Sequence, residues 1–128
     1  MGKPYTAIGL MSGTSMDGID ASIISSDGDR EYSVIADKYY KYDEKFRNDL
    51  AHIRSKILTN EDLTSFETEI EALERELTLL HAYAANDIAE KNHINIDFIG
   101  FHGHTLFHDS KEKISKQIGD GNLLSQLC

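Results

Sequence analysis

The sequence is short of cysteine, proline, tryptophan and basic residues, and each shortage excludes a class of protein. Its 128 residues include 1 cysteine, 1 proline and no tryptophan. Because Cys128 has no second cysteine to pair with, an internal disulfide cannot form. This composition is typical of a reducing compartment, for which we expect the cytoplasm.

Basic side chains are outnumbered by acidic ones. The chain has 13 Lys and Arg against 22 Asp and Glu, a formal net charge of −9. Proteins that bind nucleic acids or anionic membranes usually carry clustered Lys and Arg, and no such cluster occurs here. Apolar runs long enough to span a bilayer are also missing, as is a signal-peptide pattern. We therefore expect no nucleic-acid partner and no membrane.

The richest stretch of the sequence is 8–20, where two apolar runs flank a segment of Gly, Ser, Thr and Asp. This pattern predicts a hairpin with a functional tip. Gly13 and Gly18 can adopt positive φ, and hydroxyl side chains lie beside several free N–H groups. Consecutive N–H groups in such a turn form a concave site for anions, which suits phosphate oxygens. From residue types alone, a phosphate-binding loop and a tight hairpin capped by its own side chains are equally good interpretations.

Two carboxylates next to the tip require an addition to the phosphate-binding interpretation. Asp17 and Asp20 repel phosphate directly, but they suit a site in which a divalent cation or its waters lie between them and the phosphates. The tip differs from a Walker loop because the Gly-Lys-Ser/Thr ending is missing, and the chain has no G-x-G-x-x-G.

The rest of the chain predicts strands, then helices, then strands again. Strands are expected at 5–11, apolar on both faces as in a covered central strand, and from residue 19, where apolar and polar residues alternate. A turn at 26–29 leads to a third strand over 31–42. The residues expected on one face of that third strand are Tyr32, Val34, Ala36 and Tyr40.

Two helices are predicted in the middle of the chain. Asp43 can cap the first, whose apolar positions are Phe46, Leu50, Ile53 and Ile57. The second is expected as one long helix over 61–91, with an apolar stripe and an opposite face rich in glutamate, including Glu74. We expect the stripe to pack on the sheet of its own domain, with a coiled-coil partner as the alternative, and the glutamates to be solvated.

A fourth strand, 96–101, leads into a second polar motif, and a hairpin over 105–108 and 114–118 follows. The motif contains His102, His104 and, further on, His108, and residues two apart on a strand share a face. A zinc site, as in a metal-dependent hydrolase, is the alternative to polar groups that line a cleft. Gly103 would let a ligand reach the backbone, which suits a sugar. Asp120 is expected to cap a final helix.

Three blocks of this sequence resemble one known family. Residues 9–20, Gly-Leu-Met-Ser-Gly-Thr-Ser-Met-Asp-Gly-Ile-Asp, resemble the N-terminal ATP-binding signature of the anhydro-N-acetylmuramic acid kinases, bacterial enzymes of the sugar kinase/actin superfamily. Residues 99–105 resemble a Gly-x-His-Gly-Gln-Thr segment of that family, with His104 where Gln is more usual. Residues 117–120 resemble its Gln-Ile-Gly-Asp run.

The resemblance implies an α/β fold. The expected unit is a ribonuclease H-like (actin-type ATPase) N-terminal lobe, a mixed sheet with an antiparallel hairpin meander followed by helices. We expect it to be incomplete, because relatives carry a second lobe that would follow residue 128. The implied source is bacterial.

The same resemblance implies a reaction in peptidoglycan recycling. The family opens the 1,6-anhydro ring of anhydro-N-acetylmuramic acid with water and transfers the ATP γ-phosphoryl group to O6, giving N-acetylmuramic acid 6-phosphate. ATP and Mg²⁺ are the implied cofactors, with Asp17 and Asp20 near the metal through its waters. His102, Gly103 and Thr105 would face the sugar. The residues implied to hold ATP are Gly13, Thr14, Ser15, Met16, Asp17, Gly18, Ile19 and Asp20.

The resemblance also places the catalytic base outside this sequence. The family's base is an Asp in a segment that would follow Cys128, and Asp120 is better explained as a helix cap. We therefore expect a chain that is inactive alone, with a homodimer or a complementing C-terminal half as possible assemblies. The alternative is a module that binds a sugar or nucleotide without chemistry.

Overall fold

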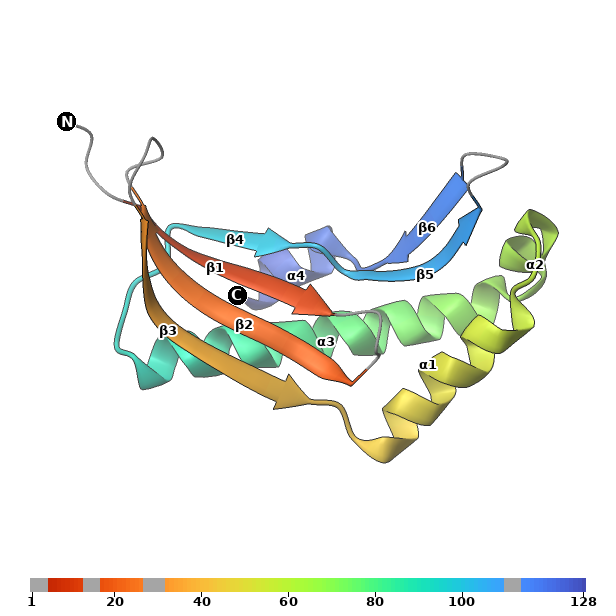
Figure 1. Cartoon of the computed structure of the whole chain (residues 1–128), viewed down its shortest axis with the longest axis horizontal. Helices are drawn as coiled ribbons and strands as arrows, with labels where there is room; N and C mark the ends of the chain where they lie inside the picture. The colour runs from red at the N-terminus through yellow and green to blue at the C-terminus, as the bar shows by residue number, and fades with distance from the viewer. Residues whose placement is uncertain (1–4, 13–16, 27–31, 110–113) are drawn as a thin grey trace.

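The structure is a computed structural model that describes residues 5–12, 17–26, 32–109 and 114–128 (Figure 1). In chain order the elements are β1 (Tyr5–Ser12), β2 (Gly18–Ser26), β3 (Tyr32–Lys41), α1 (Glu44–Lys56), α2 (Asn60–Ser65), α3 (Glu67–Lys91), β4 (Phe98–Phe101), β5 (His104–Asp109), β6 (Ile114–Ile118) and α4 (Gly121–Leu127). In the part of the chain that the structure describes, the helices are too short or too polar to cross a bilayer.

Four strands form one mixed sheet in the order β3-β2-β1-β4. The first three are antiparallel neighbours, as the hairpin pattern predicts, and β4 returns parallel to β1. Strands β5 and β6 form a separate antiparallel pair. Figure 1 shows α3 running along one face of the four-stranded sheet, where it contacts β1, β2 and β3. The predicted α/β class and the mixed sheet are confirmed.

Strand β1 is central, but it is not covered on both faces as the sequence suggested. Ile8 and Leu10 are buried, whereas Tyr5, Gly9 and Met11 are exposed. The reason is that, among the described residues, the long helix packs on one face of the sheet and leaves the opposite face uncovered. We call this opposite side the open face.

Strand β3 contains an irregularity that corrects a second expectation. Ile23 pairs with Ala36, but its neighbour Ile24 pairs with Val34, so Ile35 has no partner in the register. One extra residue in a strand reverses which side chains face the core. Val34 is therefore 59% exposed rather than on the predicted apolar face with Ala36.

The helices follow the predicted patterns with one break. Asp43 accepts a hydrogen bond from the N–H of Phe46 at 2.7 Å and caps α1, whose four predicted apolar positions are all buried. The single helix expected over 61–91 is instead two, because the backbone at Phe66 (φ −106°, ψ 22°) leaves the α-helical region. A capping box between Thr59 and Asp62 starts the short α2.

The stripe of α3 packs on the sheet of its own chain, as expected. Its buried residues include Ile70, Leu73, Leu77, Ala84 and Ile88. These residues meet Ile8, Leu10, Ile19, Ala21 and Ile23 of the sheet in one core. Burial of apolar area of this kind supplies most of the stability of a small domain.

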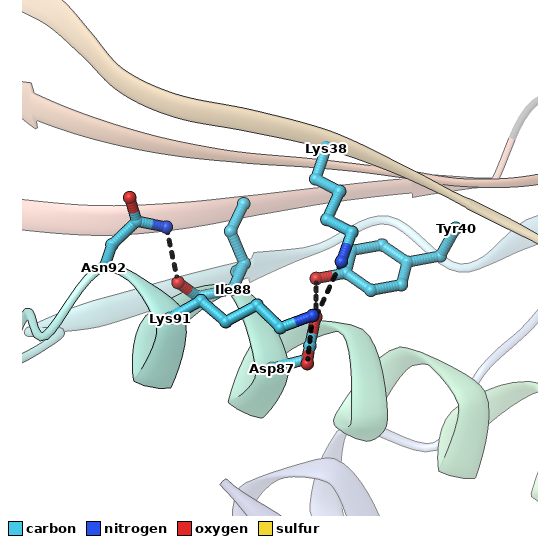
Figure 2. Close-up of polar contacts among 6 residues, drawn as sticks. All are labelled: Lys38, Tyr40, Asp87, Ile88, Lys91 and Asn92. Atoms are coloured by element: carbon cyan, nitrogen blue, oxygen red, sulfur yellow. Dashed lines mark hydrogen bonds and ion pairs between the residues drawn. The ribbon is translucent and has the colours of Figure 1, made fainter.

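A polar cluster fixes the C-terminal half of α3 to the edge strand β3. Asp87 accepts hydrogen bonds from the Tyr40 hydroxyl at 2.6 Å and the Lys38 ammonium at 3.1 Å, and Lys91 lies 3.2 Å from its other oxygen (Figure 2). These bonds lower the pKa of Asp87 to about 2, and the hydrogen bond from Tyr40 has the largest effect. At the end of the helix, the Asn92 side chain donates to the carbonyl of Ile88 at 2.8 Å.

We predict that Asp87→Asn lowers the urea midpoint of unfolding more than Tyr40→Phe, because the first change weakens three contacts and the second removes one. The pKa of Asp87 is lower in the folded state than its ordinary value of 3.8. Its stabilising effect is thus present above that value and is lost as the pH falls toward 2. Asp49→Asn, at an exposed ion pair with Lys45, is the matched control. Equal midpoints for Asp87→Asn and Asp49→Asn would contradict the role assigned to the cluster.

Candidate functional site

The predicted hairpin tip lies between β1 and β2. Ser12, the last residue of β1, pairs with Ile19 of β2, so the two strands close the tip as an antiparallel hairpin. Gly13, Thr14, Ser15 and Met16 lie outside the described residues. The part of the predicted ATP-binding set that the structure describes is Asp17, Gly18, Ile19 and Asp20.

These four residues face different surroundings. Gly18 and Ile19 are buried, and Ile19 belongs to the core beneath the sheet. Asp17 is half-buried, and Asp20 is exposed on the open face. The contrast between Ile19 and Asp20 follows from the strand, because successive side chains point to opposite faces.

Gly18 is required for a reason other than the one expected. The positive φ angles among the described glycines occur at Gly103 and Gly119, not at Gly18. A Cβ on Gly18 would collide with the carbonyl oxygen of Tyr40 and would lie 2.9 Å from the Cα of Lys41. The glycine therefore allows β2 and β3 to approach closely just after the tip.

Tyr42 is bonded to both residues that flank the tip. Its backbone N–H donates to the carbonyl oxygen of Asp17 at 2.8 Å. Its phenol donates to the Ser12 hydroxyl at 2.7 Å. The ring is buried against Phe46, and burial raises the pKa of Tyr42 to about 12, so the phenol keeps its proton. Sequence reasoning placed Tyr42 at a strand end and gave it no role.

The two histidines of the second motif lie on opposite sides of the sheet. Gly103 has a φ of +76°, which turns the chain between β4 and β5. His102 is exposed on the open face, and His104 is 1% exposed, with its Nδ1 3.1 Å from the Ser12 hydroxyl. They therefore do not share a face as a continuous strand would require. The side chain of His108 lies outside the described part.

The arrangement of the motif bears on the zinc alternative. Among the residues that the structure describes, no three His, Cys, Asp or Glu side chains are grouped to hold a metal ion. His104 already uses Nδ1 for Ser12, and its ring is buried on the side away from His102. The described part of the motif therefore gives no support to a zinc hydrolase.

A hollow of about 470 Å³ lies on the open face where β1, β2 and β4 run side by side. Asp20 of the first motif and His102 of the second both line it. Its floor includes Gly9 and Gly100, which are paired across β1 and β4 and carry no side chains to fill the space. The fold thus brings charged and polar side chains from both motifs to one surface.

A carboxylate pair borders this hollow. The pKa of Asp20 is raised by a hydrogen bond with Asp37, by partial burial and by the charge of Asp37. Ser22 donates to the other side of the pair, to Asp37 Oδ1 at 3.1 Å. A nearby cation would relieve the repulsion between the two carboxylates, which suits the predicted place of Asp20 beside hydrated Mg²⁺.

The other predicted sugar-facing residues are less accessible. Gly103 is buried, and a Cβ there would collide with the carbonyl oxygen of Ile118 in β6. Its glycine is therefore explained by packing and by its φ angle, rather than by the approach of a ligand. Thr105 pairs with Gln117 through the backbone of β5, and its side chain lies outside the described part.

The third motif block is fixed to α3 by two hydrogen bonds that sequence reasoning missed. The N–H of Gly119 donates to Glu74 Oε2, and the N–H of Asp120 donates to Thr78 Oγ1, both at 2.9 Å. Glu74 is thus half-buried and bonded, not part of the solvated face with the neighbouring glutamates. Asp120 caps α4 as predicted, by accepting from the N–H of Leu123 at 3.1 Å.

His81, to which the sequence gave no role, is fully buried in α3. Its Nδ1 lies 2.7 Å from the carbonyl oxygen of Leu77, so Nδ1 carries a proton and donates it. Burial lowers the pKa of His81 to about 4, and the charge of His104 contributes to the lowering. The signal in the sequence was its position four residues after Leu77, on the apolar stripe.

Comparison with known proteins matches these motifs to one family. A family model described as anhydro-N-acetylmuramic acid kinase matches residues 5–128. The chain belongs to the anhydro-N-acetylmuramic acid kinase family. A relative of that name from Pelagibacter ubique is 53% identical over 127 residues, 99% of this chain and 34% of the relative. Relatives from Agrobacterium fabrum and Rhodospirillum rubrum are each 40% identical over 98% and 94% of this chain.

The family match agrees with the resemblance read from the three motif blocks, all of which lie inside the matched range. The chain spans about a third of the length of the curated anhydro-N-acetylmuramic acid kinases that it matches. The tip between β1 and β2, the hollow on the open face and the segment fixed to α3 all lie within the range that the family model matches.

The close contact at Gly18 makes a testable prediction. We expect Gly18→Ala to destabilise the chain by about 1–3 kcal/mol, because the added methyl group overlaps the β3 backbone. Gly9→Ala is the matched control, because no described atom outside its own neighbourhood lies within 4 Å of a Cβ there. Chemical denaturation of both variants measures the difference. A Gly18→Ala variant as stable as Gly9→Ala would show that β2 and β3 can separate at no cost.

The buried His81 predicts a loss of stability in acid. Its pKa is about 4 in the folded chain against an ordinary value of 6.5, so the unfolded chain binds a proton first. The free energy of unfolding should fall as the pH drops from about 6.5 to 4, by about 3 kcal/mol from this group. His81→Leu should flatten that slope, and His52→Gln, at an exposed position, should leave it. An unchanged slope in His81→Leu would assign the acid sensitivity to other groups.

Proposed function

We propose that this chain is the ribonuclease H-like N-terminal lobe of an ATP-dependent anhydro-N-acetylmuramic acid kinase that acts in bacterial peptidoglycan recycling. The observation that carries the proposal is the shared hollow, which is lined by Asp20 from the β1–β2 hairpin and by His102 from the end of β4. The strand order β3-β2-β1-β4, with β1 and β4 parallel, supports the fold assignment. The family match supports the reaction class.

In this proposal residues 13–20, which comprise the tip and the start of β2, hold the phosphates of ATP through main-chain N–H groups. Asp17 and Asp20 lie near Mg²⁺ and act through its waters, and the charge of the cation would offset the repulsion between Asp20 and Asp37. Phosphoryl transfer depends chiefly on positioning and on neutralising charge, both of which such a loop supplies. The cation would supply charge neutralisation at the transferred group when bound.

The sugar would lie on the side of the second motif. His102 is an exposed polar side chain there, and we assign it a contact with the anhydro sugar, with Thr105 as a neighbouring contributor. Gly103 is buried and would act by turning the chain so that His102 faces the sugar. Ring opening needs a carboxylate to deprotonate the attacking water. We place that base in the part of the family's sequence that follows the matched third, so the chain alone would bind but not turn over.

Calorimetry with Asp20→Asn tests the nucleotide part of the proposal. We expect this variant to bind ATP·Mg²⁺ roughly tenfold more weakly than the unmodified chain, because one charge beside the cation is lost. Asp49→Asn, exposed on α1, is the matched control and should bind normally. Equal affinity in the two variants would remove Asp20 from the nucleotide site.

A complementation experiment tests the proposed division of labour. The 128-residue chain should not phosphorylate anhydro-N-acetylmuramic acid, because the base is elsewhere. Co-expression with the remaining two thirds of the Pelagibacter ubique relative should restore turnover, since the matched third is 53% identical. Turnover by the chain alone would contradict the placement of the base. Sugar or nucleotide binding without restored turnover would favour a non-catalytic binding module.

A further inference from the structure

One buried residue joins the two ends of the β1–β2 tip. Ser12 is the last described residue before the tip, and Asp17 is the first after it. Tyr42 donates its phenolic hydrogen to the first and its backbone hydrogen to the second, at 2.7 and 2.8 Å. One residue, which directly follows β3, is therefore bonded to both ends of the tip.

The Ser12 hydroxyl also makes a hydrogen bond to the second motif. It accepts from Tyr42, so its own hydrogen is free to donate to His104 Nδ1, which lies 3.1 Å away. Burial lowers the pKa of His104, and Arg54 of α1 adds to the lowering, so the ring is neutral. We assign Nδ1 as the acceptor of this bond, which places the proton of the neutral ring on Nε2.

A second buried histidine, His81, completes the proposed chain of bonds. Because a carbonyl oxygen can only accept, the bond to Leu77 places the proton of His81 on Nδ1 and leaves a lone pair on Nε2. The Nε2 atoms of His81 and His104 are both buried without a hydrogen-bond partner among the described residues. His81 packs edge to face on Phe101, three residues before His104, with the ring centroids 5.0 Å apart, and both histidines are buried in the core. One Nε2 offers a hydrogen and the other a lone pair, the combination that one bridging water satisfies.

We propose that Tyr42, Ser12, His104 and His81 form one directional hydrogen-bond chain, which acts as a brace that positions the β1–β2 tip. The brace deepens the proposed function and rests on it for the identity of the ligand, the phosphates of a nucleotide. All four side chains are buried, and we assign them as positioning residues.

The brace predicts opposite tautomers for the two histidines. In a ¹⁵N-labelled sample of the whole chain at pH 7, long-range ¹H–¹⁵N correlation spectra should report the Nε2–H form for His104 and the Nδ1–H form for His81. This measurement needs no substitution and no ligand. The Nδ1–H form in both rings would overturn the direction of the chain, because neither Nε2 could then donate.

Variants separate positioning from stability. Tyr42→Phe removes the phenolic bond and keeps the ring, and we expect it to weaken ATP·Mg²⁺ binding roughly 3- to 10-fold, the effect of losing one hydrogen bond. It should also speed hydrogen exchange at the amide of residue 42, which bonds to Asp17. Tyr5→Phe, at an exposed tyrosine, is the matched control and should change neither.

Two substitutions of His104 test the polarity of the bonds. Gln offers a carbonyl acceptor and an N–H donor in place of Nδ1 and Nε2–H, so His104→Gln should keep the affinity, whereas His104→Leu should weaken it as Tyr42→Phe does. Equal weakening in both would overturn the brace, and so would full affinity in His104→Leu. If the unmodified chain did not bind ATP·Mg²⁺, the proposed function would fail. The tautomers of His81 and His104 and the exchange rate at the amide of residue 42 would still test whether the brace exists.

Discussion

The parallel pairing of β1 with β4 is the constraint on which the site depends. It is fixed at its start by the Thr6 N–H, which donates to the Asp97 carboxylate at 2.9 Å, and by the Asp97 N–H, which donates to the Thr6 carbonyl at 2.8 Å. Parallel strands end at the same edge of a sheet. The residues that follow β1 and those that follow β4 therefore meet, although α1, α2 and α3 separate them in sequence.

At that shared edge, Gly103 places the two histidines of the second motif in different surroundings. Its positive φ turns the chain so that His102 stays on the open face beside the hollow, while His104 enters the core and meets Ser12. The exposed ring is available to a ligand and the buried ring to the protein. Replacing a regular strand by this turn gives one short motif two separate tasks.

Much of this fold could be predicted from the sequence because local patterns determine it. Alternation in β2, the four apolar positions of α1 and the Asp120 cap all depend on neighbours in the chain. The incorrect predictions concern positions whose exposure depends on segments that are distant in sequence. The exposure of Val34 depends on the pairing of β3 with β2, and the exposure of one face of β1 depends on which helices cover the sheet.

The candidate site divides in the same way. The residue types of the tip and of the second motif indicated where ligands would bind, because hydroxyl, glycine and carboxylate groups have recognisable chemistry. The supporting residues did not stand out. In the sequence, Tyr42 is the expected end of a strand, and Glu74 and Thr78 are ordinary helix positions. Their hydrogen-bond partners lie 30 to 45 residues away in sequence.

The uncovered sheet face also governs how the isolated chain behaves in solution. Tyr5 and Phe98 stack edge to face on neighbouring strands, 5.3 Å apart, and both rings are more than half exposed. Water-exposed aromatic surface of this kind promotes contact between copies as concentration rises. Dimers or larger species of the 128-residue chain would then result from apolar contacts between these uncovered sheet faces. They would not describe how a longer family member assembles.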